Sequence, residues 1–137
     1  MDDSNDRQIA YHLADDRAEL SGLAEPSVAF GDFNLTLAVA AQCRAALQRF
    51  YGPRLKRVIL FGSSARGQAN SESDIDLLVL LARPFDYLKE LRRIVDLLYP
   101  IQLGSERLIS ALPAEIDEYE RGTQQLYRNI QQDGQVV

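Results

Sequence analysis

The residues best suited to chemistry lie in one stretch, 61–76, which reads FGSSARGQANSESDID. Asp74 and Asp76 open an apolar run, and side chains two apart on a strand share a face, so we expect these carboxylates close together. Two like charges at this spacing need a compensating cation. Carboxylate oxygens without a nearby His or Cys favour Mg²⁺ over Zn²⁺, and Mg²⁺ is commonly held by one or two carboxylates together with substrate phosphates. The pair therefore predicts a metal site that takes a nucleoside triphosphate.

The other end of this stretch suits the phosphates of such a ligand. Gly62 lets the backbone approach closely, and Ser63 brings a turn N–H and a hydroxyl that can donate to phosphate oxygens. Ser64 offers a second hydroxyl and Arg66 a positive charge. The segment is not a Walker A loop, because the Gly-Lys-Ser/Thr ending is absent. We therefore predict nucleotide binding by Gly62, Ser63, Ser64 and Arg66.

Helices and strands that could position these residues follow from the apolar spacing. Apolar side chains recur at helical steps in three segments, continuous apolar runs indicate strands covered on both faces, and Gly and Pro mark the ends. The order α-β-β-α-β-α predicts an α+β domain with helices packed on a small sheet. The predicted elements are a helix over 34–51, strands over 57–61 and 74–81, a helix over 86–99 ended by Pro100, a strand over 107–112, and a helical tail over 116–130 broken near Gly122.

Charge divides the chain into two parts. The 137 residues carry a net charge of −5, and residues 1–25 hold seven acids and two bases, so the rest is neutral. We predict an acidic N-terminal arm over 1–31, with a helix over 6–20 and a connector over 24–32, and one globular domain over 32–137. The acidic balance argues against direct binding of nucleic acid through a broad cationic face.

Cysteine content and hydropathy favour a cytoplasmic protein. Cys43 is the single cysteine, and the N-terminus is acidic where a signal peptide would be basic and then apolar. The longest apolar run, 77–82, is six residues long, against the roughly 20 needed to cross a bilayer. We therefore expect no membrane segment.

Gly62-Ser63, ten intervening residues and then Asp74-x-Asp76 resemble the signature of the polymerase-β-like nucleotidyltransferase superfamily. The similarity covers about residues 34–133, and the chain is similar in size to the minimal nucleotidyltransferases. This resemblance implies a small mixed sheet of three to four strands. It also implies ATP as substrate and two Mg²⁺ ions held by Asp74 and Asp76, which makes these two residues catalytic.

The chain departs from that pattern at one place. Active members usually carry a third carboxylate on the strand after the next helix, and here that strand has no acid at its centre. Glu106 has the alternation phase needed to reach the metals from the strand entrance, provided that the strand register places it there, and is a weak candidate for the third ligand. Asp96 falls within the predicted helix and is expected to be solvated there.

The resemblance favours a transfer of AMP from ATP to a hydroxyl on a partner protein. Minimal nucleotidyltransferases resemble antitoxins encoded beside HEPN-domain RNases, which implies a HEPN-type toxin as the partner. Two alternatives stay open: a non-catalytic antitoxin or binding module with a vestigial nucleotide site, and a small-molecule nucleotidyltransferase similar to the aminoglycoside-modifying enzymes. The small-molecule enzyme would need a dimer or a partner to complete its acceptor pocket, so a homo-oligomer also stays open.

Overall fold

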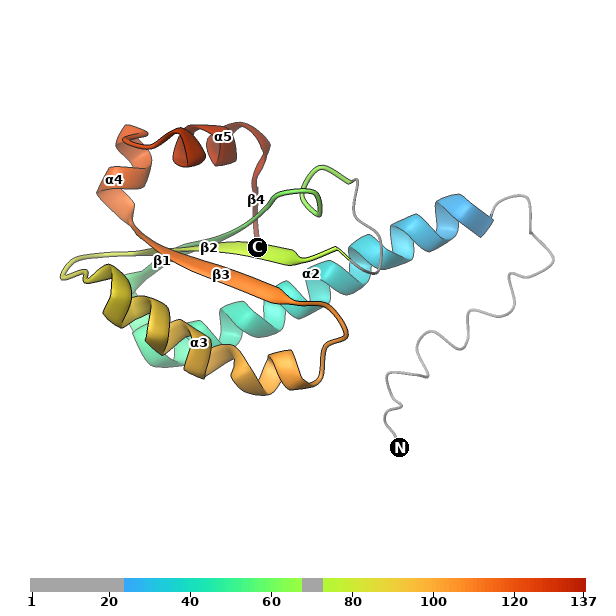
Figure 1. Ribbon diagram of the computed structural model, residues 1–137, viewed down its shortest axis with the longest axis horizontal. Coiled ribbons are helices and arrows are strands. Elements are labelled where there is room, and N and C mark those ends of the chain that lie inside the picture. The colour runs from blue at the N-terminus through green and yellow to red at the C-terminus, as the bar shows by residue number, and fades with distance from the viewer. Residues whose placement is uncertain (1–23, 68–72) are drawn as a thin grey trace. The chain divides into compact units, whose positions relative to one another are not determined.

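The computed structural model describes residues 24–67 and 73–137. Over residues 32–137 it is a mixed four-stranded sheet in the order β3-β2-β1-β4. Helices α2 and α3 cover one face of the sheet, and α4 and α5 cover the other (Figure 1). This arrangement confirms the predicted α+β class and the small mixed sheet. The elements are α2 (Ala24–Tyr51), β1 (Leu55–Phe61), β2 (Ile75–Leu81), α3 (Tyr87–Leu103), β3 (Ile109–Glu115), α4 (Ile116–Arg121), α5 (Gln125–Asp133) and β4 (Gln135–Val136).

Strand β2 is the centre of the fold and carries one of the two carboxylates. It pairs antiparallel with β1 and parallel with β3. Alternate residues of β2 enter two separate cores, so Ile75 and Leu77 pack toward α2 and α3 whereas Leu78 and Leu80 pack toward α4 and α5. A strand buried on both faces reads as a continuous apolar run, which is why the sequence predicted it well.

The first helix differs from its prediction. Helix α2 begins at Ala24, so the connector predicted over 24–32 is wrong. A proline is tolerated in the first helical turn, whose N–H groups have no intrahelical partner, and Pro26 lies there. An internal glycine such as Gly31 costs only about 1 kcal/mol. The helix predicted over 6–20 lies outside the described residues.

Two prolines lie inside a helix and a strand that were predicted to end before them. Pro100 lies within α3, which continues to Leu103, because Ile101 packs on the core and offsets the lost hydrogen bond. Pro113 lies within β3, and this is tolerated because β3 is an edge strand of the sheet. The predicted break at Gly122 is confirmed, since this glycine caps α4 in the left-handed conformation.

Strand β4 was not predicted. Its two residues pair with Ile59 and Leu60 of β1, and the Gln135 side chain donates a hydrogen bond to the Ala65 carbonyl at 2.9 Å. A two-residue strand has too little pattern to be detected in sequence. None of the helices in the described part of the chain has the length and apolar character needed to span a membrane.

Candidate active site

Asp74 and Asp76 lie where the chain enters β2. Asp74 immediately precedes the strand and is exposed, whereas Asp76 is its second residue and is half-buried. Ile75 between them is fully buried in the core toward α2 and α3. Alternation along the strand therefore turns both carboxylates toward the opposite face of the sheet.

The surroundings of Asp76 disfavour the ionised form of its carboxyl group. Burial raises the pKa of the Asp76 carboxyl, and the negative charge of Asp74 raises it further. Across residues 33–67 and 73–137, no Lys or Arg forms an ion pair with either carboxylate. A cation placed between the two would remove both the repulsion and part of the desolvation cost. This donor set fits a hard divalent cation such as Mg²⁺.

The turn that begins at Gly62 lies in contact with the pair Asp74 and Asp76. Gly62 follows Phe61, which lies opposite Asp76 in the β1–β2 ladder, and it adopts a positive φ of 78°. A Cβ atom at this position would lie 2.5 Å from Asp76 Oδ2, closer than real contacts allow. Glycine is therefore required here both for the backbone conformation and for the approach of the turn to the carboxylate.

The two serines of the turn over residues 62–67 differ in exposure and in hydrogen bonding. The Ala65 N–H donates to the Gly62 carbonyl at 3.2 Å, and the Gly67 N–H donates to the Ser64 carbonyl at 3.3 Å. Ser63 is partly exposed, but Ser64 is only 1% exposed, and its hydroxyl donates to the Asp74 carbonyl at 3.2 Å. The prediction that Ser64 offers a hydroxyl to the nucleotide does not fit this placement, because its hydroxyl is enclosed and already bonded within the protein. Arg66 is exposed on the turn.

One residue that was not predicted, Arg107, joins the glycine turn to the segment before Asp74 by hydrogen bonds. Arg107, just before β3, donates from Nε to the Ser73 carbonyl at 2.7 Å and from Nη2 to Ser64 Oγ at 3.0 Å. Its Nη1 donates to the hydroxyl of Thr36 on α2. A single guanidinium thus joins α2, the turn at Ser64 and the approach to Asp74. Its partners are distant in sequence, so no local pattern could have identified it.

The β3 residue level with Asp76 is Ser110. Neighbouring residues of paired strands share a face, so Ser110 occupies the position from which a third carboxylate would reach the other two. Glu106 is exposed and precedes the strand, and Asp96 is exposed on α3. In the portion of the chain that the structure describes, no three acidic, His or Cys residues form a group able to hold a metal. Glu106, the weak candidate for a third ligand, therefore does not reach the two aspartates, because the register of β2 and β3 places it four residues before Ser110.

Comparison with known proteins finds a matching domain family and two similar relatives. A family model described as "Nucleotidyltransferase domain" matches residues 40–136. A Methanocaldococcus jannaschii protein named "Putative protein adenylyltransferase MJ0604" is 33% identical over 93 residues, which cover 67% of this chain and 87% of that protein. A second, "Putative protein adenylyltransferase MJ0141", is 42% identical over 59 residues, 43% of this chain and 59% of that protein.

A similar fold occurs in a solved structure. The crystal structure of a "putative nucleotidyltransferase" from Sulfolobus solfataricus superposes with a TM-score of 0.52 at 20% identity. The match covers 80% of this chain and 85% of that one. At this identity the likeness concerns the fold alone.

Proposed function

Because the chain belongs to the nucleotidyltransferase domain family, we propose that it transfers AMP from ATP to a hydroxyl group of a partner protein in a Mg²⁺-dependent reaction. The observation that carries this proposal is the contact between the two motifs: Gly62 has no Cβ, and Asp76 Oδ2 occupies that space. The glycine turn and the aspartate pair therefore form one site. The relatives named as protein adenylyltransferases support a protein as the acceptor.

Each residue of the site has a distinct role in this proposal. Asp74 and Asp76 hold Mg²⁺, which when bound neutralises the triphosphate and the departing pyrophosphate. The backbone and hydroxyl of Ser63 donate to phosphate oxygens, and Arg66 adds positive charge beside them. Ser64 positions the turn through its bond to the Asp74 carbonyl.

The transfer itself needs mainly positioning and charge neutralisation from the protein. The acceptor oxygen forms a bond to the α-phosphorus, the bond from that phosphorus to the bridging oxygen breaks, and pyrophosphate leaves. The proton of the acceptor hydroxyl passes to solvent. A HEPN-domain RNase encoded beside this chain is the acceptor that the family resemblance favours.

A labelling experiment tests the proposal directly. The protein is incubated with Mg²⁺, ATP labelled at the α-phosphate and the protein encoded beside it, and label on that protein is the expected result. Asp74→Asn and Asp76→Asn should abolish labelling, whereas Asp96→Asn removes an exposed acid on α3 and should not. Absence of labelling with every nucleoside triphosphate would refute the proposed activity.

A non-catalytic antitoxin is the second candidate, and the serine at position 110 favours it. With two carboxylates instead of three facing the site, the metals would be held weakly, and the chain would neutralise a partner by binding alone. The double variant Asp74→Asn/Asp76→Asn separates the two functions. Full neutralisation of the partner by this variant would support the binding role and exclude a catalytic one.

A further inference from the structure

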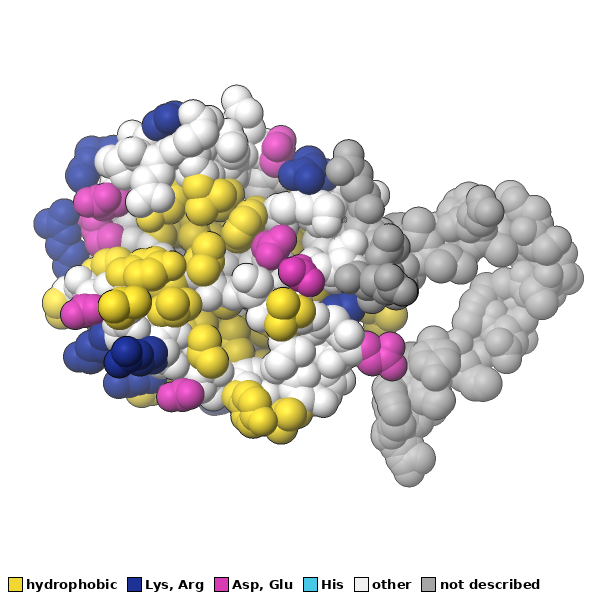
Figure 2. Space-filling model, in the orientation of Figure 1, with side chains coloured by type: hydrophobic (Ala, Val, Ile, Leu, Met, Phe, Trp, Pro, Cys, Tyr) yellow, Lys and Arg dark blue, Asp and Glu magenta, His cyan; other side chains and the backbone are white. Residues whose placement is uncertain are grey.

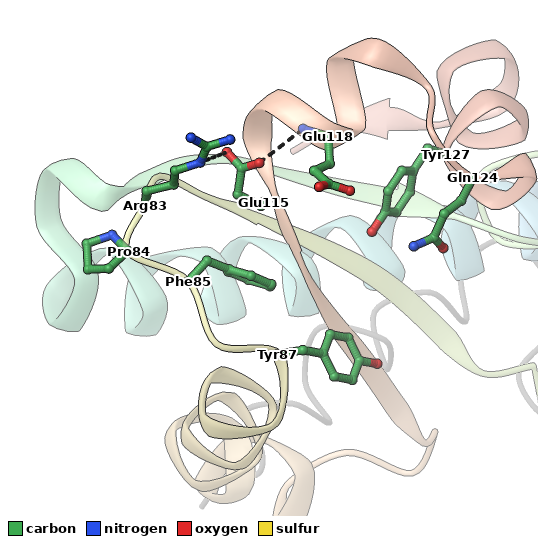
Figure 3. A pocket seen from close by; sticks show the side chains of 8 residues that line it. All are labelled: Arg83, Pro84, Phe85, Tyr87, Glu115, Glu118, Gln124 and Tyr127. Atoms are coloured by element: carbon green, nitrogen blue, oxygen red, sulfur yellow. Dashed lines mark hydrogen bonds and ion pairs between the residues drawn. The ribbon is translucent and has the colours of Figure 1, made fainter.

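The two ends of the sheet differ in how their charged groups are paired. Beyond the end of β2, a cavity of about 850 Å³ is lined by Arg83, Glu115 and Glu118 among others. Figure 3 shows that these groups bond to one another: Arg83 contacts the Glu115 carboxylate, which also accepts the Glu118 N–H at 3.2 Å. Acidic side chains gather over the start of β2 (Figure 2), where no described Lys or Arg forms an ion pair with Asp74 or Asp76. A further residue that acts on the nucleotide must therefore reach the start of β2.

The glycine turn over residues 62–67, which lies at this end, finishes in a carbonyl that needs a donor from outside the turn. Backbone N–H groups within the turn donate to the carbonyls of Gly62, Ser63 and Ser64 at 3.2 or 3.3 Å. In the part of the chain that the structure describes, no backbone N–H donates to the next carbonyl, that of Ala65. Ala65 is only 8% exposed, and a buried carbonyl without a partner destabilises the fold.

The side chain of Gln135 supplies this donor. Its Nε2 donates to the Ala65 carbonyl at 2.9 Å, although the two residues are 70 positions apart in the chain. Side chains cap the last carbonyls of helices in the same way. The Ala65 side chain packs in the core toward α2 and α3. The turn is therefore fixed at this residue both by packing and by the bond from Gln135.

Strand β4 places Gln135 beside the turn. Gln135 pairs with Leu60 of β1, two residues before Gly62. A Cβ atom added to Gly134 would lie 2.6 Å from Ile59 Cγ2, closer than real contacts allow. Glycine at position 134 thus permits the close approach of β4 to β1, and this approach brings the Gln135 carboxamide to Ala65.

We propose that Gln135 is a positioning residue for the nucleotide. By holding the Ala65 carbonyl it fixes the turn, so the Ser63 N–H is directed at the phosphate oxygens before they bind. Arg107, just before β3, holds Ser64, and β3 and β4 are the two edges of the sheet. The turn is thus held from both edges. This inference rests on the proposed binding of ATP at the turn.

The first test examines the turn without nucleotide. Amide hydrogen exchange of the full-length protein is followed by NMR in the natural chain and in Gln135→Met, which keeps the length of the side chain and removes its N–H donors. Loss of the bond to Ala65 should speed the exchange of the Arg66 and Gly67 amides about fivefold. Gln132→Met is the matched control, because Gln132 is exposed near the end of α5, and it should leave this exchange unchanged.

Two further measurements separate positioning of the turn from support of the fold. The Val137 N–H donates to the Val58 carbonyl at 2.9 Å, so slow exchange of this amide reports that β4 is in place. It should stay slow in Gln135→Met. Gln135→Lys returns an N–H donor that is long enough to reach the Ala65 carbonyl, and it should restore most of the slow exchange of the turn.

The second test measures ligand binding by calorimetry. Gln135→Met should weaken Mg-ATP binding about fivefold, the effect of losing one hydrogen bond that orders the site. Binding of Mn²⁺ without nucleotide should stay unchanged, because the carboxylates of Asp74 and Asp76 do not depend on the Ala65 carbonyl. A residue that supported only the fold would alter both affinities together.

Three outcomes would overturn the positioning role. Unchanged exchange of the turn amides in Gln135→Met would mean that the bond does not fix the turn. An equal loss of protection at Val137 would mean that Gln135 supports only β4. Unchanged Mg-ATP affinity in this variant would mean that a fixed turn is not needed for binding. Failure of the proposed function gives a different result, since the natural chain itself would then bind no nucleoside triphosphate.

Discussion

Gly62→Ala provides the sharpest test of the site geometry. The new Cβ would lie 2.5 Å from Asp76 Oδ2, below the 3.0 Å that real Cβ contacts essentially never cross. An alanine at a φ of 78° costs about 1–2 kcal/mol from backbone strain. Because Oδ2 is the far end of the Asp76 side chain, turning the carboxylate aside adds about 0.5–1.5 kcal/mol, the cost of an off-rotamer side chain.

Gly67→Ala is the matched control for this substitution. Gly67 also has a positive φ, of 74°, but a Cβ added to it would have no atom of the described residues within 4 Å. It should therefore show the backbone cost alone. Urea denaturation followed by circular dichroism measures both free energies of unfolding, and Mn²⁺ titration followed by electron paramagnetic resonance measures metal affinity.

A double-substitution cycle separates the clash from other effects. In an Asp76→Ala background the carboxylate is gone, so Gly62→Ala should cost no more than Gly67→Ala does in the natural chain. In the natural chain it should cost distinctly more and weaken Mn²⁺ binding at least tenfold. Equal costs at the two glycines, together with unchanged Mn²⁺ affinity, would refute the close approach of the turn to Asp76.

Four further predictions concern the same site and the arm. Asp76→Asn should raise the melting temperature of the metal-free protein at neutral pH: the pKa of Asp76 is raised in the folded state, so its ionised form costs stability. This advantage should shrink as the pH falls toward 4, the ordinary pKa of an aspartate being about 3.9, and an advantage that grows in acid would contradict the sign. Arg107→Met should weaken nucleotide binding about tenfold, because several hydrogen bonds to a charged group are lost. Arg107→Lys should lose less affinity, and calorimetry measures both variants. Equal losses of affinity in the two variants would mean that only packing matters. Ser110→Asp should tighten Mn²⁺ binding at least threefold by adding a carboxylate level with Asp76, and unchanged affinity would show that the side chain does not face the metal. Removal of residues 1–23, which leaves α2 complete, should spare Mg-ATP binding and weaken partner binding most at low salt, and loss of ATP binding would mean that the arm belongs to the site.

The central strands and the pairing of the two motifs could be predicted from sequence because the signals are local. Leu77 to Leu81 form a continuous apolar run. Gly62 directly follows the last residue of β1, Phe61, which pairs with Asp76 near the start of β2. Interactions between distant residues could not be predicted in the same way. The bonds from Arg107 to Thr36, Ser64 and Ser73 depend on how α2 and β3 pack, and the role of Ser110 depends on the register between β2 and β3.

The ends predicted before two prolines were wrong for a related reason. A proline usually interrupts an element, so Pro100 and Pro113 predict ends at those positions. Whether the chain continues through a proline depends on its neighbours: α3 gains core contacts beyond Pro100, and β3 has an unpaired edge at which a missing N–H costs little. Neither condition can be read from the residues beside the proline.

The antiparallel pairing of β1 with β2 has a consequence for the order of folding. Gly62 and Asp76 meet across strands that are neighbours in sequence, so closing this hairpin requires only the connection over 62–74. The parallel partner β3 returns only after the whole of α3, and such a long crossover forms more slowly. The contact between the two motifs can thus form early in folding, and the guanidinium of Arg107 fixes it only when β3 docks. Pulse-labelling hydrogen exchange should protect the amides of β1 and β2 before those of β3.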